Sequence, residues 1–219
     1  MSEKVQGKII VVGIGPGSLD YILPVAKKCI EEANVVVGGS RALQTFARDD
    51  QEQMTIQADI DAVLAFIREK MRAEDVVVMV SGDPGYYSML DALRRTFPTE
   101  SITVIPGISS MQLAFSRVTL PWHEARLLSF HGRVPKEEML RYEKGAICGM
   151  LTDGKHNSHT IARAFLNHGW PKKTRLYILS RLSYEDERVI ETTLDGAERI
   201  EKIGHGILII EDRTNESGE

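Results

Sequence analysis

The chain of 219 residues is long enough for two small domains of about a hundred residues each. Its content of 42% apolar and 26% charged residues is typical of a folded globular protein and excludes a disordered one. With 27 basic and 31 acidic residues, the formal net charge of -4 argues against nucleic acid as a partner. An anionic small molecule stays compatible with this charge, because a few local cations suffice to bind it.

The cysteines and the start of the chain indicate a cytoplasmic protein. Cys29 and Cys148 lie in apolar surroundings without the spacing of a metal site or a disulfide framework, so we expect both to be buried thiols. Residues 1–8 are polar and lead directly into an apolar run, which leaves no room for a signal peptide. No apolar run approaches the roughly 20 residues that cross a bilayer, so we expect no membrane segment.

Short apolar runs recur along the chain and predict strands that are buried on both faces. These runs cover residues 9–12, 35–37, 76–80, 102–105, 127–130, 146–151, 176–179 and 207–210. Helical patterns lie between them, most clearly over residues 59–71, where apolar side chains recur every three or four positions. The alternation predicts an α/β protein with a mainly parallel first sheet and helices on both faces.

A break in the alternation predicts a boundary between two domains. Pro121 lies within residues 119–123 and fits neither a central strand nor a helix interior, and polar residues follow it. We therefore expect one α/β domain at residues 1–120 and a second at residues 121–219.

The second domain is predicted to contain a mixed sheet. Residues 181–189 are dense in charge and indicate a turn between antiparallel strands. The polar tail beyond Asp212 is expected to fray.

Glycine-rich loops follow the first four predicted strands. The loops are Gly13-Ile-Gly-Pro-Gly17, Gly38-Gly39-Ser40, Ser81-Gly-Asp-Pro-Gly85 and Pro106-Gly-Ile-Ser-Ser110. Each of them alone is also compatible with a tight turn into a helix. Loops at the carboxyl ends of parallel strands meet at one edge of the sheet, however, and ligands bind there. The set therefore predicts a ligand site.

The first loop does not match a dinucleotide-binding fingerprint. Its glycines are spaced G-x-G-x-G and not G-x-G-x-x-G, and Pro16 lacks the backbone N–H that a pyrophosphate would bind. A nicotinamide oxidoreductase is therefore the weaker interpretation.

The third and fourth loops carry polar side chains near the predicted edge. Asp83 suits a ribose or the ammonium and sulfonium groups of S-adenosylmethionine, although it could instead be the N-cap of a helix opened by Pro84. Ser109 and Ser110 begin a helix predicted over residues 110–117, where their hydroxyls could cap the helix or bind a ligand carboxylate.

Histidine and arginine side chains offer substrate contacts but no metal site. His131 and Arg133 follow a predicted strand and could bind carboxylates, or form a solvated surface turn. His156 and His159 share one face of a predicted helix, but no third ligand with zinc-site spacing accompanies them, so we expect no protein-bound metal. No arrangement typical of a Ser or Cys nucleophile stands out.

Taken in order, the motifs resemble those of the tetrapyrrole methylases. They are VGIGPG, VVVGGSRAL, VSGDPGYYS, VIPGISS and GHGILII, between Ile9 and Ile210. Within that family, VVGIGPGSLDYILPVA, VVVGGSRAL and LLSFHGR are most similar to the enzymes that methylate carbon 5 of cobalt-precorrin-7 or of precorrin-6Y. The resemblance implies a two-domain fold, S-adenosylmethionine held in a cleft between the domains, and carbon methylation in cobalamin biosynthesis.

The resemblance also implies which residues form the site. Those implied to bind the cofactor are Pro16, Asp83, Tyr86, Ser109, Ser110, Leu151, Thr152 and Gly206. Those implied to bind the substrate are Gly15, Gly17, His131 and Arg133. Methyl transfer from a sulfonium depends on alignment and exclusion of water, and the sequence identifies no general base. The family further implies a homodimer and a partner enzyme that removes an acetate group and methylates carbon 15.

Alternative functions remain at this stage. Within the family, the substrate could be another tetrapyrrole, a diphthamide precursor or a ribose of ribosomal RNA. From other classes, the alternatives are a nicotinamide oxidoreductase and a noncatalytic corrinoid carrier.

Overall fold

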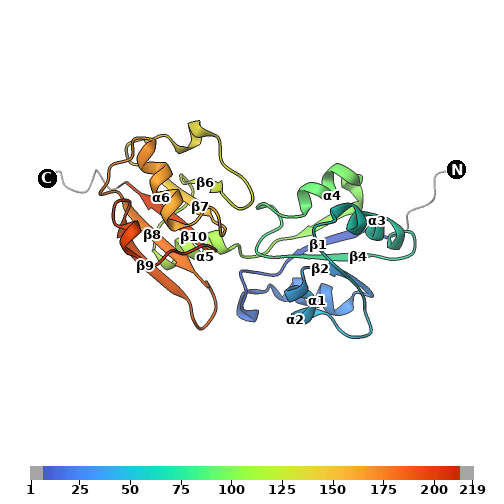
Figure 1. Ribbon diagram of the computed structural model, residues 1–219. Coiled ribbons are helices and arrows are strands. Elements are labelled where there is room, and N and C mark those ends of the chain that lie inside the picture. Colours follow the sequence, from blue (N-terminus) through green and yellow to red (C-terminus); the bar gives the residue numbers. More distant parts are fainter. Residues whose placement is uncertain (1–6, 213–219) are drawn as a thin grey trace. The chain divides into compact units, whose positions relative to one another are not determined.

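The computed structural model describes residues 7–212, which form two α/β units (Figure 1). The division between the units falls between Ser109 and Ser110, so the described part of the first unit is residues 7–109 and that of the second is residues 110–212. No helix among residues 7–212 is long and apolar enough to cross a membrane. The predicted fraying beyond Asp212 lies outside the described residues.

The first unit contains a five-stranded parallel sheet with the order β3-β2-β4-β1-β5. Its strands are β1 (Ile9–Gly13), β2 (Val35–Gly38), β3 (Glu52–Thr55), β4 (Val76–Val80) and β5 (Ile102–Ile105). The predicted parallel sheet is confirmed. Strand β3 was not predicted, because its sequence EQMT is polar and its side chains are exposed or half-buried at the edge of the sheet.

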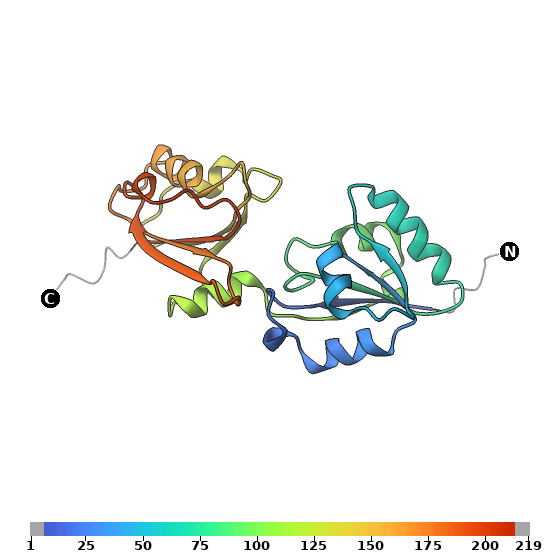
Figure 2. The same ribbon diagram turned by 60° about the horizontal axis from the view of Figure 1, so that its bottom comes forward.

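Helices cover both faces of the first sheet. They are α1 (Pro24–Glu32), α2 (Ser40–Phe46), α3 (Ile60–Lys70) and α4 (Leu90–Thr96), with the 3₁₀ turns η1 (Leu19–Tyr21) and η2 (Thr99–Ser101). Ile30 of α1 and Leu43 of α2 belong to the apolar cluster on one face, whereas Ile67 of α3 and Leu93 of α4 belong to the cluster on the other. Figure 2 shows α1 (blue) and α3 (teal) on opposite sides of the sheet.

The start of α4 corrects one sequence prediction. The helix begins at Leu90, so Pro84 does not open it and Asp83 is not its N-cap. Residues 84–87 form turns. The loop between β4 and α4 is therefore longer than the sequence indicated.

The second unit contains a mixed sheet with the order β6-β7-β10-β8-β9, as predicted. Its strands are β6 (Arg126–Ser129), β7 (Ile147–Leu151), β8 (Arg175–Ser180), β9 (Arg188–Thr193) and β10 (Ile207–Glu211). Only the β6–β7 pair is parallel among these neighbours. The charged segment after β8 makes the predicted turn, because β8 and β9 pair in antiparallel register.

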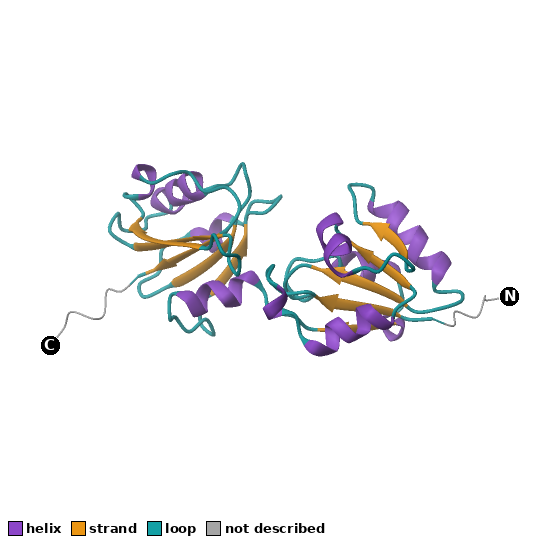
Figure 3. Ribbon diagram, turned by 90° about the horizontal axis from the view of Figure 1, so that it is seen from below, coloured by secondary structure: helices purple, strands orange, loops and turns teal. Residues whose placement is uncertain are grey.

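Two α-helices pack on opposite faces of the second sheet (Figure 3). They are α5 (Ser110–Arg117) and α6 (Ser158–Asn167), accompanied by the 3₁₀ turns η3 (Glu137–Leu140) and η4 (Ala197–Arg199). A Cβ on Gly149 would come within 2.7 Å of Met111 and Phe115 of α5. The neighbouring Met150 belongs to the cluster that holds Phe165 of α6, because successive strand residues point to opposite faces.

Helix α5 thus groups with the second unit, whereas the expected first domain extended to residue 120.

The two cysteines differ in burial. Cys148 is buried in β7, and this burial raises the pKa of its thiol to about 12. Cys29 is only half-buried, which corrects the expectation that both thiols are fully buried, although burial and then Glu32 still raise its pKa. Both thiols therefore stay protonated near neutral pH and are poor nucleophiles.

Candidate active site

The loops after β1 and β4 are joined by backbone hydrogen bonds. The N–H of Gly82 donates to the carbonyl of Gly15 at 2.8 Å, and the N–H of Gly15 donates back to Gly82 at 3.4 Å. Because β1 and β4 are neighbours in the parallel sheet, their carboxyl ends bring these glycines together. The structure therefore confirms that the loops after β1 and β4 meet at this edge of the sheet.

The loop after β5 packs backbone to backbone against the other two. A Cβ on Gly13 would lie 2.5 Å from the carbonyl oxygen of Gly82 and 2.6 Å from the nitrogen of Gly107. A Cβ on Gly107 would likewise meet the backbone of Gly82 and of Gly13. Real Cβ atoms do not approach backbone atoms so closely, so glycine is required at Gly13 and Gly107 for the three loops to meet.

Asp83 ties the loop after β4 to the loop after β5. One carboxylate oxygen accepts the N–H of Gly85 at 2.8 Å, and the other accepts the N–H of Gly107 at 3.1 Å. Each carboxylate oxygen has two lone pairs, so Asp83 can also accept a hydrogen bond from a ligand. Asp83 therefore positions the loops and retains acceptor capacity toward the edge of the sheet.

Tyr86 and Tyr87 follow Asp83 in the same loop. Tyr86 is half-buried, and burial followed by the nearby Tyr87 raises the pKa of its phenol, which stays neutral and can donate a hydrogen bond. The two rings contact edge to face with centroids 4.8 Å apart. Tyr87 has a φ of 52°. This backbone conformation is unfavourable for a bulky residue, and such strained conformations cluster in functional loops. The sequence did not single out Tyr87, because backbone strain leaves no signature in sequence.

The remaining first-unit candidates lie on the same loops. Gly15 is buried with a φ of 79°, while Pro16 and Gly17 are half-buried. Ser109 is 7% exposed and ends the first unit, and Ser110 begins α5.

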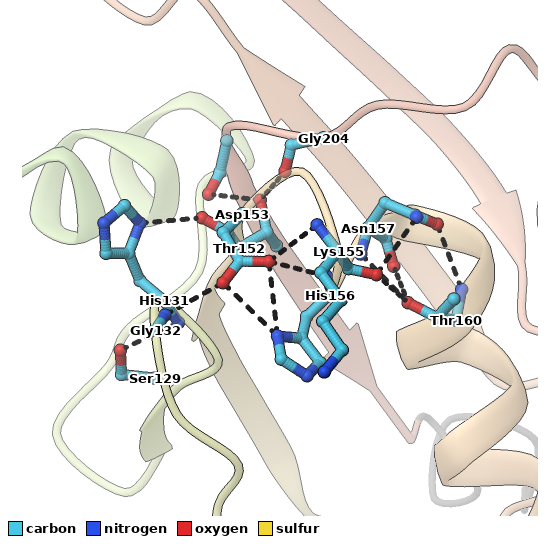
Figure 4. Close-up of polar contacts among 11 residues, drawn as sticks. Ser129, His131, Gly132, Thr152, Asp153, Lys155, His156, Asn157, Thr160 and Gly204 are labelled. Carbon is cyan, nitrogen blue, oxygen red and sulfur yellow. Dashed lines mark hydrogen bonds and ion pairs between the residues drawn. The ribbon is translucent and has the colours of Figure 1, made fainter.

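The second unit has its own polar cluster where β7 ends and β10 begins (Figure 4). The N–H and the hydroxyl of Thr152 donate to the carbonyl of Gly206 at 3.2 and 3.1 Å, and the hydroxyl also bonds the carbonyl of Gly204. Leu151 pairs with Ile207 in the adjacent register position. The structure thus brings together the three predicted second-unit cofactor residues, Leu151, Thr152 and Gly206.

His131 lies against this cluster with a defined tautomer. Its Nδ1 is 3.2 Å from the carbonyl oxygen of Thr152, as Figure 4 shows. A carbonyl only accepts, so Nδ1 carries the proton and Nε2 of the neutral ring is an acceptor. The ring of His205 lies 6.2 Å away between centroids. The sequence did not indicate this proximity, because it depends on the pairing of β6 with β7 and of β7 with β10.

Asp153 holds the turn that follows Thr152. Its carboxylate accepts N–H groups from Gly132, Lys155 and His156 at 2.8, 2.9 and 2.6 Å, together with the ring of His156. The N–H groups of His156 and Gly132 hold the pKa of Asp153 far below its usual range. This network holds the backbone of Gly132, the residue between His131 and Arg133.

The Asp153 network predicts a component of acid stability. A folded-state pKa below the unfolded value of about 4 stabilises the protein above that pH, and the contribution is lost as pH falls further. Asp153→Asn should therefore lower stability at pH 7 and weaken its dependence on pH below about 4. Urea unfolding between pH 7 and pH 2 measures this, with Asp49→Asn at an exposed turn as the control. An unchanged slope in Asp153→Asn would contradict the assignment.

The other histidines of this region have structural partners. His156 contacts Asp153, and Nε2 of His159 lies 2.9 Å from the carbonyl of Ile200. Within residues 7–212 no group of three or more His, Cys, Asp or Glu side chains is arranged to hold a metal ion. Arg133 is exposed next to Gly132.

Two solved structures share this architecture. The precorrin-6Y methylase of cobalamin biosynthesis from Archaeoglobus fulgidus superposes with a TM-score of 0.71 and 27% identity, over 94% of this chain and 98% of that chain. The uroporphyrin-III C-methyltransferase of Thermus thermophilus, complexed with S-adenosylhomocysteine, superposes with a TM-score of 0.72 and 22% identity, over 94% and 92% of the two chains. This chain therefore has the two-unit α/β fold of these methyltransferases.

Residues 8–198 match the family model of the Tetrapyrrole (Corrin/Porphyrin) Methylases. The chain belongs to this family of S-adenosylmethionine-dependent methyltransferases. Among its relatives, the cobalt-precorrin-7 C(5)-methyltransferase of Salmonella typhimurium is 34% identical over 183 residues, which are 83% of this chain and 88% of that protein.

Proposed function

We propose that this protein transfers the methyl group of S-adenosylmethionine to carbon 5 of cobalt-precorrin-7 in cytoplasmic cobalamin biosynthesis. The observation that carries the proposal is the 34% identity to a cobalt-precorrin-7 C(5)-methyltransferase over 83% of this chain. The motif LLSFHGR, which contains His131 and Arg133, supports the same subgroup of the family.

The proposed cofactor site uses the two clusters described above. Bound S-adenosylmethionine would supply an electrophilic methyl group on its sulfonium. We assign its contacts to Pro16, Asp83, Tyr86, Ser109, Ser110, Leu151, Thr152 and Gly206. In this assignment Asp83 faces positive groups or ribose hydroxyls, and the neutral Tyr86 phenol offers one more hydrogen bond. Rigid glycine contacts hold the loops in place before the ligand arrives, which favours alignment.

The substrate site is assigned to Gly15, Gly17, His131 and Arg133. A corrinoid precursor presents several carboxylates, and Arg133 is suited to bind one of them through two hydrogen bonds. His131 offers Nε2 beside Thr152 and is held in place by the carbonyl of that residue.

Product analysis tests the proposed reaction. Cobalt-precorrin-7 is incubated with S-adenosylmethionine that carries a ¹³C-methyl group, followed by mass spectrometry and carbon NMR. We expect one labelled methyl group at carbon 5 and release of S-adenosylhomocysteine. Label at another ring carbon would assign a different tetrapyrrole reaction, and binding of NAD without S-adenosylhomocysteine would reject methyl transfer.

Arg133→Ala should separate substrate binding from cofactor binding. Loss of the guanidinium is expected to lower kcat/KM about tenfold, mainly through KM, because uniform binding is lost. The affinity for S-adenosylhomocysteine should hardly change. Steady-state kinetics and calorimetry measure the two effects, with the exposed Arg141→Ala as the control. Loss of S-adenosylhomocysteine binding in a folded Arg133→Ala protein would move this arginine to the cofactor site.

We also propose a homodimer that works with a separate enzyme for decarboxylation and methylation at carbon 15. Both follow from the family and from the substrate class. Light scattering at micromolar concentration should give twice the mass of the chain. A monomer under these conditions would reject the dimer.

A further inference from the structure

A pocket of about 610 Å³ opens in the first unit at the edge of the sheet opposite to the glycine loops. It is lined by residues just before β1, at the end of α3 and between α4 and β5. In a parallel sheet these positions lie at the amino ends of the strands. The length of β1, about 16 Å for five residues, therefore separates this pocket from the loops at the other end.

The floor of the pocket is apolar and well packed. Met71 and Phe97 line it with only 3% and 8% of their surfaces exposed, and both belong to the core cluster under α3 and α4. The guanidinium of Arg68 lies over the Phe97 ring, 5.4 Å from its centroid. Such a floor favours an apolar group, and the volume of the pocket is in the range of small-molecule sites.

The rim of the pocket is cationic in a chain that is acidic overall. Lys8, Arg68 and Arg72 line it, against the single carboxylate of Glu100. Nearby Lys70 is paired with Glu52 at 2.6 Å, but no carboxylate within residues 7–212 forms an ion pair with the side chains of Lys8 or Arg68. Two side-chain cations without an ion-pair partner beside an apolar floor create a site for an anion that carries an apolar group.

We propose that this pocket binds a small aromatic anion, with one or two fused rings and a phosphate or carboxylate group. The ring lies on Met71 and Phe97, and the anionic group contacts Lys8 and Arg68. The site is distinct from the glycine loops, so this proposal stands independently of the methyl-transfer reaction.

The probe that tests the pocket is 1-naphthyl phosphate, which combines both halves of the proposed ligand. Calorimetry should show binding at least about tenfold tighter than that of 1-naphthol or inorganic phosphate. 1-Naphthoate in place of the phosphate decides which anionic group is preferred. In a protein with ¹³C-methyl methionine, ring currents should shift the Met71 methyl signal and leave that of Met150, in the second unit, unchanged.

Charge reversal tests the rim. Arg68→Glu should weaken 1-naphthyl phosphate binding at least about tenfold, whereas Arg94→Glu, the same change at an exposed α4 residue outside the pocket, should alter it less than about twofold. Lys8→Glu serves as a second variant if Arg68→Glu does not fold. Saturating S-adenosylhomocysteine should leave the affinity unchanged. Equal losses in Arg68→Glu and Arg94→Glu, an unshifted Met71 signal or no binding at millimolar probe would each overturn the proposal.

Discussion

Gly13→Ala is expected to abolish S-adenosylhomocysteine binding and to lower the free energy of unfolding by about 3 kcal/mol. The added methyl group would lie 2.5 Å from the Gly82 carbonyl and 2.6 Å from the Gly107 nitrogen. Both atoms belong to backbone, so no side chain can rotate away to make room. The loops after β1, β4 and β5 must then separate, and the edge on which we place the cofactor loses its shape.

Gly39→Ala is the matched control for this substitution. Gly39 follows β2 at the same edge, but nothing lies within 4 Å of a Cβ built there, and its φ of -63° suits any residue. We expect a stability change below about 1 kcal/mol and unaltered binding. Urea unfolding and calorimetry with S-adenosylhomocysteine measure both variants. If Gly13→Ala and Gly39→Ala bind S-adenosylhomocysteine with equal affinity, cofactor binding does not depend on the contact among the three loops.

Asp83→Ala is expected to weaken S-adenosylhomocysteine binding by about 1.5–3 kcal/mol, the range typical of hydrogen bonds to a charged group. The variant removes a carboxylate whose two oxygens accept the N–H groups of Gly85 and Gly107, so the loops after β4 and β5 lose their connection. It also removes the acceptor that we assign to the cofactor. Some loss of stability should accompany the loss of affinity.

Asp59→Ala separates a general loss of stability from a loss at the site. Asp59 caps α3 by accepting the N–H of Ala62 at 3.0 Å, and its removal should cost about 1 kcal/mol of stability. The affinity of the Asp59→Ala protein for S-adenosylhomocysteine should equal that of the native protein. Asp83→Ala with native affinity in calorimetry, once shown to be folded, would exclude this carboxylate from cofactor binding.

The sequence by itself determined the central architecture and the place of the ligand edge. Short and uniformly apolar runs such as residues 76–80 favour strands that are buried on both faces. Helices between such strands make the first sheet parallel, and a parallel sheet gathers the loops after its strands at one edge. The glycines and Asp83 could therefore be predicted to lie at one edge of the sheet without coordinates.

Tertiary structure decided which of these residues touch. The contact of Asp83 with Gly107, 24 positions away, exists because β4 and β5 both flank β1, an order that local propensity does not encode. Thr152 meets Gly206 across 54 positions through the register of β7 with β10. Strand β3 was missed because a polar edge strand is held by pairing with its neighbour and not by an apolar pattern. Periodicity reports how one element packs, whereas strand order and register depend on the fit of the whole core.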